Sequence, residues 1–258
     1  MYTTLAWRNI WRNKRRSLIT IFSITFAVLL ACVMRSMQLG SYGRMIENSV
    51  RFYTGYIQIH EDGYWDDKVV DNSFIYDPEK LSEVNQLKGV QTFVPRLESF
   101  ALSSFKSQTK GALVMGVDPE RENDLTRVKS KLVDGSYLKS DDEGILVSQG
   151  LANYLKANVG DTIVLLGQGY HGANAAGLFP VRGIVKFAMP QQNNQLVYMN
   201  LAKAQWFYAA DQLITSVALV IDDPDDAPKI TQQIKKIYSG ESYEVMDWKE
   251  LVPDLVQS

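Results

Sequence analysis

The sequence has few of the residues that enzyme active sites and metal sites most often use. Its 258 residues include one cysteine, Cys32, and two histidines, His60 and His171. One thiol cannot form an internal disulfide, and two distant histidines define no histidine-based metal cluster. The pattern GxxxxGK followed by Ser or Thr is also absent, so the sequence has no P-loop for hydrolysing ATP.

Acidic residues are missing from the first part of the chain, where Glu47 is the first carboxylate. Seven of the 27 basic residues precede it, so the remaining 20 share the rest of the chain with all 29 acidic residues. The seven are Arg8, Arg12, Lys14, Arg15, Arg16, Arg35 and Arg44. A net charge of −2 therefore conceals a basic start and an acidic body. Because the body is acidic, we expect no nucleic-acid partner.

Charge of either sign is missing from residues 17–34, which read SLITIFSITFAVLLACVM. As a helix this run spans roughly 27 Å, close to the hydrocarbon core of a bilayer. We therefore expect a transmembrane helix over residues 17–36. The basic residues concentrate before it, so residues 1–16 should be cytoplasmic and the main domain outside.

The residues around this run are patterned as well. Residues 1–16 fit an amphipathic helix in the lipid headgroup layer, and residues 37–52 continue a helical pattern as a stalk. The expected membrane-interface residues are Trp7, Arg8, Trp11, Arg12, Arg15 and Arg16. A stripe of small residues predicts packing against another helix, through Thr20, Ser23, Ala27 and Ala31.

A second interpretation of the N-terminus remains open. Leu29-Leu30-Ala31-Cys32 resembles a lipobox, and Cys32 is the single cysteine. The chain would then be a surface lipoprotein lipidated at Cys32, a binding module without a transporter. A cleaved signal peptide fits less well, because no convincing small-x-small site follows the apolar run.

From Gly55 onward the pattern changes to short strands mixed with short helices, which predicts an α+β domain. Strands are expected at 55–60, 90–94, 97–105, 110–117, 144–147, 162–166, 179–187, 196–199, 216–221 and 243–246. Helices are expected at 78–87, 148–155, 201–208 and 227–238. Roughly 200 residues suffice for two small cores.

The candidate chemical motifs favour structural roles. Residues 167–172 satisfy GxGxxG, but neither a long helix nor an acidic residue at the right distance follows. The acidic run 222–226 precedes an expected helix, where carboxylates offset the helix dipole, and its spacing is not that of a calcium loop. We therefore expect no enzyme active site, cofactor or metal.

One loop lacks charge altogether. Residues 167–177 hold four glycines and no charged residue, and apolar residues follow. Long loops with apolar residues often bind something. We predict a protein-docking hairpin that uses Tyr170, His171, Leu178, Phe179 and Pro180.

Several stretches together resemble a known family. They are LAWRNIWRNKRR at 5–16, MGVDP at 115–119, LVDGSYL at 132–138, GILV at 144–147, VGDT at 159–162 and WKELVP at 248–253. In this order they are similar to ABC transporter permeases of the MacB, FtsX and lipoprotein-releasing (LolC/LolE-like) type. Members continue after the last stretch into three further spans, which this sequence does not include.

The resemblance implies one transmembrane helix and a stalk leading to a periplasmic domain of two subdomains. One subdomain would comprise residues 53–117 and 219–258, and the other would be an insert at 118–218. The chain would be a non-catalytic permease subunit in the bacterial inner membrane. A separate cytoplasmic ABC ATPase subunit would hydrolyse ATP. Further expected partners are a second permease copy or homologue and a periplasmic lipoprotein chaperone. The implied transport function is release or localisation of lipoproteins, or export of a substrate from the inner membrane.

Overall fold

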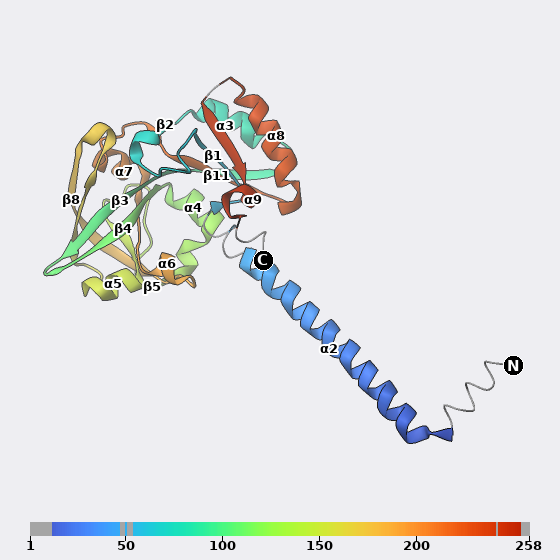
Figure 1. Ribbon diagram of the computed structural model, residues 1–258. Coiled ribbons are helices and arrows are strands. Elements are labelled where there is room, and N and C mark those ends of the chain that lie inside the picture. The colour runs from blue at the N-terminus through green and yellow to red at the C-terminus, as the bar shows by residue number, and fades with distance from the viewer. Residues whose placement is uncertain (1–11, 47–49, 51–53, 241, 254–258) are drawn as a thin grey trace. The chain divides into compact units, whose positions relative to one another are not determined.

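The computed structural model describes residues 12–46, 50, 54–240 and 242–253. The chain divides into two compact units, residues 1–48 and residues 49–258 (Figure 1).

Within its described residues, the first unit contains one long helix, α2, Lys14–Ile46. Its segment Lys14–Gln38 is long and apolar enough to cross a membrane. The most apolar part of this segment is not buried against the rest of the protein. This is the one such helix among the residues that the structure describes. It contains the expected span 17–36 and continues into the expected stalk as far as Ile46; Phe52 lies outside the described residues.

The second unit mixes strands and helices, as the sequence predicts. The strands are β1 Ile57–Glu61, β2 Phe74–Ile75, β3 Val90–Phe105, β4 Gln108–Val117, β5 Leu132–Gly135, β6 Ile145–Ser148, β7 Thr162–Gln168, β8 Asn174–Val185, β9 Leu196–Asn200, β10 Leu213–Ile214, β11 Ser216–Ile221 and β12 Tyr243–Asp247. The helices are α3 Pro78–Asn85, α4 Pro119–Thr126, α5 Gln149–Leu155, α6 Pro190–Asn193, α7 Leu201–Phe207, α8 Ala227–Ile237 and α9 Trp248–Leu251.

Six strands close into a ring. Each strand pairs with the next in the order β3-β4-β9-β6-β8-β7, and β7 pairs back onto β3. Closure removes free sheet edges along the paired positions and leaves an inside and an outside face. The buried cluster inside includes Ala101, Val114, Ile145, Val147, Ile163, Leu165, Ala175, Phe179, Val181, Val197 and Met199. Side chains of α5 and α7 join this cluster, among them Leu151, Leu155, Ala204 and Phe207.

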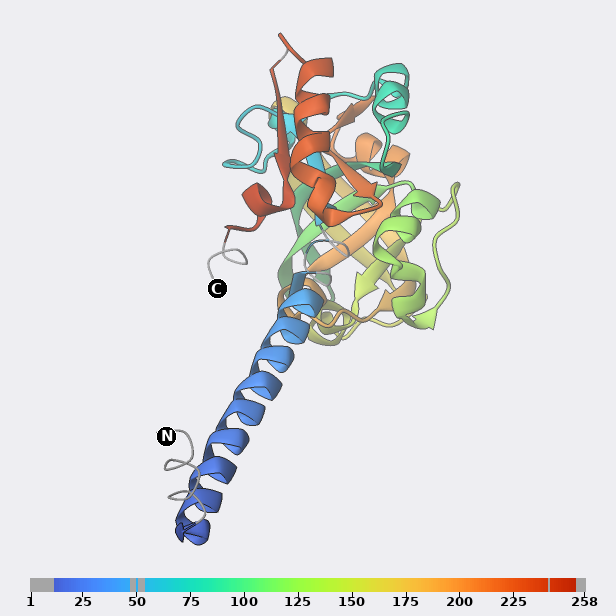
Figure 2. The same ribbon diagram turned by 90° about the vertical axis from the view of Figure 1, so that its right-hand side faces the viewer.

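The same β3 also belongs to an open antiparallel sheet. Its first half pairs with β11, which pairs with β1, which pairs with β12. Helix α8 lies beside β12, and both appear in red and orange in Figure 2. Because β3 has 16 residues, one continuous strand joins the sheet to the ring.

The structure contains one helix that the sequence patterns do not predict, and it corrects one predicted loop. The polar stretch after Pro119 contains a helix, α4, whose N-terminus is capped by Asp118 accepting from the amides of Glu120 and Arg121. The loop expected at 167–177 is mostly strand, because β7 ends at Gln168 and β8 begins at Asn174. Strand β11, Ser216–Ile221, runs across the predicted boundary at 218/219 and lies between β1 and β3. The division into two subdomains stays a prediction.

Candidate partner-binding surface

The predicted docking hairpin exists as the antiparallel pair β7–β8, joined by a short turn at residues 169–173. The turn is fastened to the body of the second unit. The Tyr170 amide donates to the Tyr208 carbonyl at 2.7 Å, and the His171 amide donates to Asp71 Oδ1 at 2.6 Å. A Cβ on Gly169 would lie 2.5 Å from the Tyr208 carbonyl oxygen, so glycine permits this close approach.

The five predicted docking residues lie on different faces of the hairpin. Leu178 is 69% exposed and His171 is exposed, whereas Tyr170 and Pro180 are half-buried. Phe179 is fully buried inside the ring, where its ring meets Phe207 edge-on at 5.3 Å between centroids. The prediction is therefore corrected for Phe179: it holds the hairpin in place and has no surface to offer a partner.

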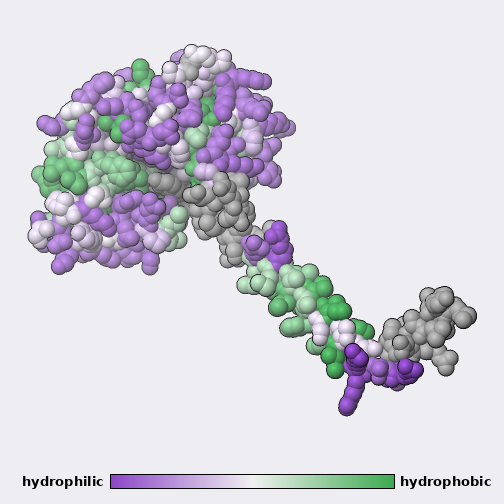
Figure 3. Space-filling model, viewed as in Figure 1, coloured by the Kyte–Doolittle hydropathy of each residue, from purple (hydrophilic) through white to green (hydrophobic). Residues whose placement is uncertain are grey.

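Three further apolar residues lie beside Leu178 on the outer face of the ring. Leu102 of β3 is opposite Leu166 of β7, and Leu178 of β8 is diagonal to Leu166, since Leu166 is opposite Ala176. Phe100 lies two residues before Leu102 on the same face. These four residues, called the apolar strip below, are 45–69% exposed. Figure 3 shows hydrophobic atoms gathered on this side of the second unit, over β3 and β8.

Sequence reasoning missed three members of the strip. Phe100, Leu102 and Leu166 alternate with the buried residues Ala101, Ser103 and Leu165. Because both faces of these strands carry apolar residues, the alternation of apolar and polar residues gives no sign of which face is outside.

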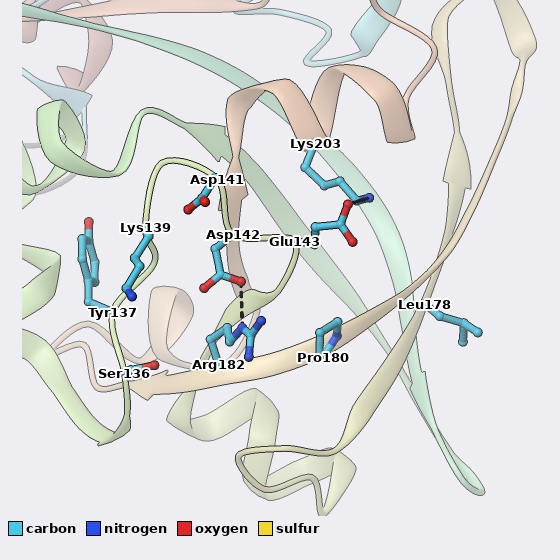
Figure 4. Close-up of a pocket in the computed structure, with 10 residues that line it drawn as sticks. All are labelled: Ser136, Tyr137, Lys139, Asp141, Asp142, Glu143, Leu178, Pro180, Arg182 and Lys203. Carbon is cyan, nitrogen blue, oxygen red and sulfur yellow. Dashed lines mark hydrogen bonds and ion pairs between the residues drawn. The ribbon is translucent and has the colours of Figure 1, made fainter.

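A charged cleft of about 500 Å³ borders the strip at Leu178. Its lining carries both signs of charge, from Lys139, Asp141, Asp142, Glu143, Arg182 and Lys203. Arg182 Nε donates to Asp142 Oδ1 at 2.7 Å, and Lys203 Nζ donates to Glu143 Oε1 at 3.3 Å. Figure 4 shows Leu178 at the rim, pointing away from these pairs. The cleft therefore offers paired charges next to an apolar face.

One ionisable group of the cleft is held neutral. Burial raises the pKa of Tyr137 above its ordinary value, and the charges of Glu122, Asp118 and Asp124 raise it further. The phenol donates to the Pro119 carbonyl at 2.7 Å. Tyr137 therefore anchors the cleft wall and is not available as a base.

The predicted membrane residues fall partly within the described part of the chain. Arg12, Arg15 and Arg16 are exposed, while Trp7, Arg8 and Trp11 lie outside the described residues. The stripe residues Thr20, Ser23, Ala27 and Ala31 are exposed on α2, and the Thr20 hydroxyl donates to the Arg16 carbonyl at 2.9 Å. Cys32 is an exposed free thiol on the same helix. Whether the stripe packs against another helix stays a prediction.

Among the described residues, no group of three or more His, Cys, Asp or Glu side chains is arranged to hold a metal ion. What the surface offers is an apolar strip, paired charges and a fastened turn. Such an arrangement can bind a protein or an amphiphilic surface.

Comparison with known proteins shows the family to which the chain belongs. Residues 17–237 match the family described as MacB-like periplasmic core domain. The chain is 24% identical over 253 residues to the lipoprotein-releasing system transmembrane protein LolC of Neisseria meningitidis serogroup B, covering 92% of this chain and 57% of that protein. It is 32% identical over 178 residues to LolE of Haemophilus influenzae, covering 66% of this chain and 41% of that protein. The chain thus spans about half the length of these relatives.

Two solved structures share the fold. The periplasmic region of MacB from Actinobacillus actinomycetemcomitans matches with a TM-score of 0.55 and 13% identity, covering 83% of this chain and 98% of that one. The extracellular domain of the transporter YknZ from Gram-positive bacteria matches with a TM-score of 0.52 and 13% identity, covering 74% and 99%. The chain therefore belongs to the MacB-like periplasmic core domain family, among the ABC transporter permeases of the MacB, FtsX and LolC type.

Proposed function

We propose that this chain is a non-catalytic permease subunit that passes ATP-driven motion to a periplasmic domain and thereby releases lipoproteins from the inner membrane. Permease components of the Lol and MacB type are its relatives, and both curated relatives named above are lipoprotein-releasing proteins. A separate cytoplasmic ABC ATPase hydrolyses ATP, and a second permease copy or homologue completes the transporter.

The apolar strip is the single observation that carries this proposal. Four large, exposed apolar side chains at neighbouring positions on one face of three strands are unusual on the solvent face of a domain. Burying a leucine side chain contributes about 1.5–3 kcal/mol, so the strip can supply most of the affinity of a transient protein contact. The occupant we propose is a soluble periplasmic carrier that receives the lipoprotein.

The strand order supports a mechanical role. β1, the first strand of the second unit, lies between β12 and β11, and β11 pairs with β3, which carries Phe100 and Leu102. A displacement of β1 therefore moves hydrogen-bonded neighbours that lead directly to the apolar strip. Motion of this kind requires two states that differ in their contacts. It does not require a residue that acts as an acid or a base.

The experiment is lipoprotein release from proteoliposomes that hold the full-length permease with its ATPase, with a soluble carrier in the medium. Replacing Leu166 and Leu178 together by Asp should reduce ATP-dependent release about tenfold or more, because a loss of 1.4 kcal/mol is tenfold in affinity. ATP hydrolysis should stay within about twofold of wild type. Val133→Asp on β5 is the matched control, since Val133 is a 49% exposed aliphatic residue outside the strip.

If the double variant releases lipoprotein as well as wild type does, the apolar strip has no role in release. If the wild-type transporter shows no ATP-dependent release, lipoprotein transport is not its function. Mass spectrometry of the membrane-extracted protein decides the alternative: a diacylated Cys32 with residues 1–31 missing supports the surface lipoprotein, and an intact Met1 excludes it.

A further inference from the structure

The connection between β1 and β2, residues 62–73, crosses from the open sheet to the ring. Internal hydrogen bonds keep it compact: the Asp67 amide donates to the Gly63 carbonyl at 3.1 Å, and Asn72 Nδ2 donates to the Asp67 carbonyl at 2.8 Å. Val70 inserts into the buried cluster of the ring and is 3% exposed. We refer to residues 62–73 as the crossing segment.

One end of the crossing segment holds the turn of the β7–β8 hairpin. Asp71 Oδ1 accepts from the His171 amide at 2.6 Å, across 100 residues of sequence. A cleft of about 360 Å³ lies between this segment and the hairpin, lined by Asp67, Lys68, Asp71, Phe100 and Gln168 among others. The segment therefore touches the turn and borders the apolar strip at Phe100.

The other end rests on a buried histidine. The ring of Trp65 stacks on that of His60 at 5.9 Å and 17°, and Lys68 Nζ lies 3.4 Å from the centre of the Trp65 ring. His60 is fully buried at the centre of the open sheet. Its Nδ1 lies 3.2 Å from the Glu61 carbonyl, and its Nε2 is buried with no hydrogen-bond partner among the described residues.

The groups that face His60 come from every element around it. They are Glu244 of β12 (3.6 Å from Nδ1), Ser216 of β11 (opposite His60 in register), Glu61 of its own strand, and Asp62, Tyr64, Trp65 and Lys68 of the crossing segment. A proton on Nε2 would give a buried N–H without an acceptor in this arrangement, and it would bring a second positive charge near Lys68.

We infer that the crossing segment is a pH-sensitive latch: proton uptake by His60 displaces Trp65 and weakens the hold of Asp71 on the turn of the β7–β8 hairpin. Asp71 holds the hairpin turn at neutral pH and releases it below neutral pH, while the Tyr170 amide bond to Tyr208 is outside the latch. The latch concerns this chain alone and does not depend on which partner binds the apolar strip.

The direction of the pH effect follows from the surroundings of His60. Burial lowers the pKa of His60 from its ordinary value of 6.5, and the positive charge of Lys68 lowers it further. The Glu61 carbonyl and the charge of Asp62 raise the pKa but do not outweigh burial. A ring freed into water takes up a proton near its ordinary pKa. The closed latch is therefore fully stable above pH 6.5 and loses stability as the pH falls from 6.5 through the lower pKa of the closed form. Burial raises the pKa of Glu244 and that of Glu61, and their protonation favours the closed form.

Hydrogen exchange of the full chain in lipid nanodiscs tests the latch. The amides of Tyr170 and His171 are bonded to Tyr208 and Asp71, so the peptide that covers residues 169–173 reports the closed state. After correction for intrinsic exchange, its protection should fall several-fold from pH 7.5 to pH 5.5, since each pKa unit between closed and open forms gives about tenfold. Because Glu61 and Glu244 act with the opposite sign, such a fall excludes them as its cause.

Two variants separate the two histidines. His60→Gln should make the protection of residues 169–173 independent of pH. His171→Asn keeps the backbone amide and a residue that tolerates its positive φ of 50°, so its pH dependence should match wild type. Equal protection at both pH values in wild type, or a pH dependence that survives in His60→Gln, overturns the latch.

A third variant covers the case in which His60→Gln does not fold. Trp65→Ala removes the ring that rests on His60 and should give low protection of residues 169–173 already at pH 7.5. Wild-type protection in Trp65→Ala would show that the hold on the turn does not pass through Trp65.

Discussion

Arg96 and Glu122 form an ion pair in the interior of the second unit. Arg96 Nε and Nη2 donate to the two carboxylate oxygens of Glu122 at 2.9 and 2.8 Å, and the two residues are 1% and 0% exposed. Burial acts to lower the pKa of Arg96, but the charges of Glu122 and Glu98 outweigh it, and the pKa lies above its ordinary value. The pair fastens α4 to β3, the strand that joins sheet and ring.

Removing one charge of this pair should destabilise the second unit strongly. Glu122→Gln leaves the Arg96 guanidinium buried without its bidentate partner, which typically costs about 3–5 kcal/mol. Urea unfolding of the full chain in detergent, followed by tryptophan fluorescence, measures the loss. Glu120→Gln on the same helix is exposed and should change the free energy of unfolding by no more than about 1 kcal/mol. Equal unfolding midpoints for the two variants would contradict the structural role of the pair.

The hairpin shows what a sequence can and cannot tell about single residues. Missing charges and glycines predict a loop within a protein-docking hairpin at 167–180; the structure has a hairpin there, with strand through most of the expected loop, and its docking role stays a prediction. Leu178 and Phe179 are adjacent apolar residues, and a shift of one residue exchanges the inside and outside faces of a strand. The register that buries Phe179 is set by the pairing of β7 with both β3 and β8, which no local pattern contains.

At the scale of elements, the stretch Met115–Pro119 has a packing role at each position from Gly116 on. Val117 is buried, Asp118 caps α4, and Pro119 occupies the first turn of that helix. A Cβ on Gly116 would lie 2.2 Å from Cβ of Ala204 in α7. The stretch therefore fixes how β4 ends, how α4 begins and how closely α7 approaches.

Gly116→Ala should consequently displace α7 and destabilise the second unit by about 1–3 kcal/mol, the usual cost of overpacking. Gly111→Ala provides a matched control, because Gly111 lies in the same strand and a Cβ there meets nothing within 4 Å. Chemical unfolding of both variants and wild type gives the comparison. A Gly116→Ala variant as stable as Gly111→Ala would mean that α7 accommodates the methyl group freely.

Most elements could be predicted from local patterns, and their arrangement could not. Helix α3 lies within the range 78–87 that is predicted to be helical, and Asp77 before it accepts from the amides of Glu79 and Lys80. Helix α4 was missed because the residues after Pro119 are mostly polar, so they carry little apolar periodicity. The closed ring was missed because closure depends on β7 pairing with β3, some 60 residues away. Pairings of that separation leave no local signal.

At the scale of the whole molecule, the charge asymmetry and the division into units coincide. The acid-free residues 1–46 fall in the first unit, whose helix α2 exposes its apolar side chains, and nearly all 29 acidic residues fall in the second. A bilayer is the solvent in which an exposed apolar helix is stable. Because basic residues are retained on the cytoplasmic side, the first unit should also decide on which side the second unit lies.

The single cysteine makes this topology directly measurable. In a Cys32→Ser background, Ser107→Cys places one thiol at the exposed turn between β3 and β4. A membrane-impermeant maleimide should label it almost fully in intact spheroplasts, to the same extent as after permeabilisation. Replacing Arg12, Lys14, Arg15 and Arg16 by Gln and adding Ser36→Lys and Gln38→Lys reverses the charge bias, and labelling of intact spheroplasts should then fall to less than about half. Labelling that appears only after permeabilisation of the Cys32→Ser, Ser107→Cys protein would place the second unit in the cytoplasm and contradict a periplasmic binding surface.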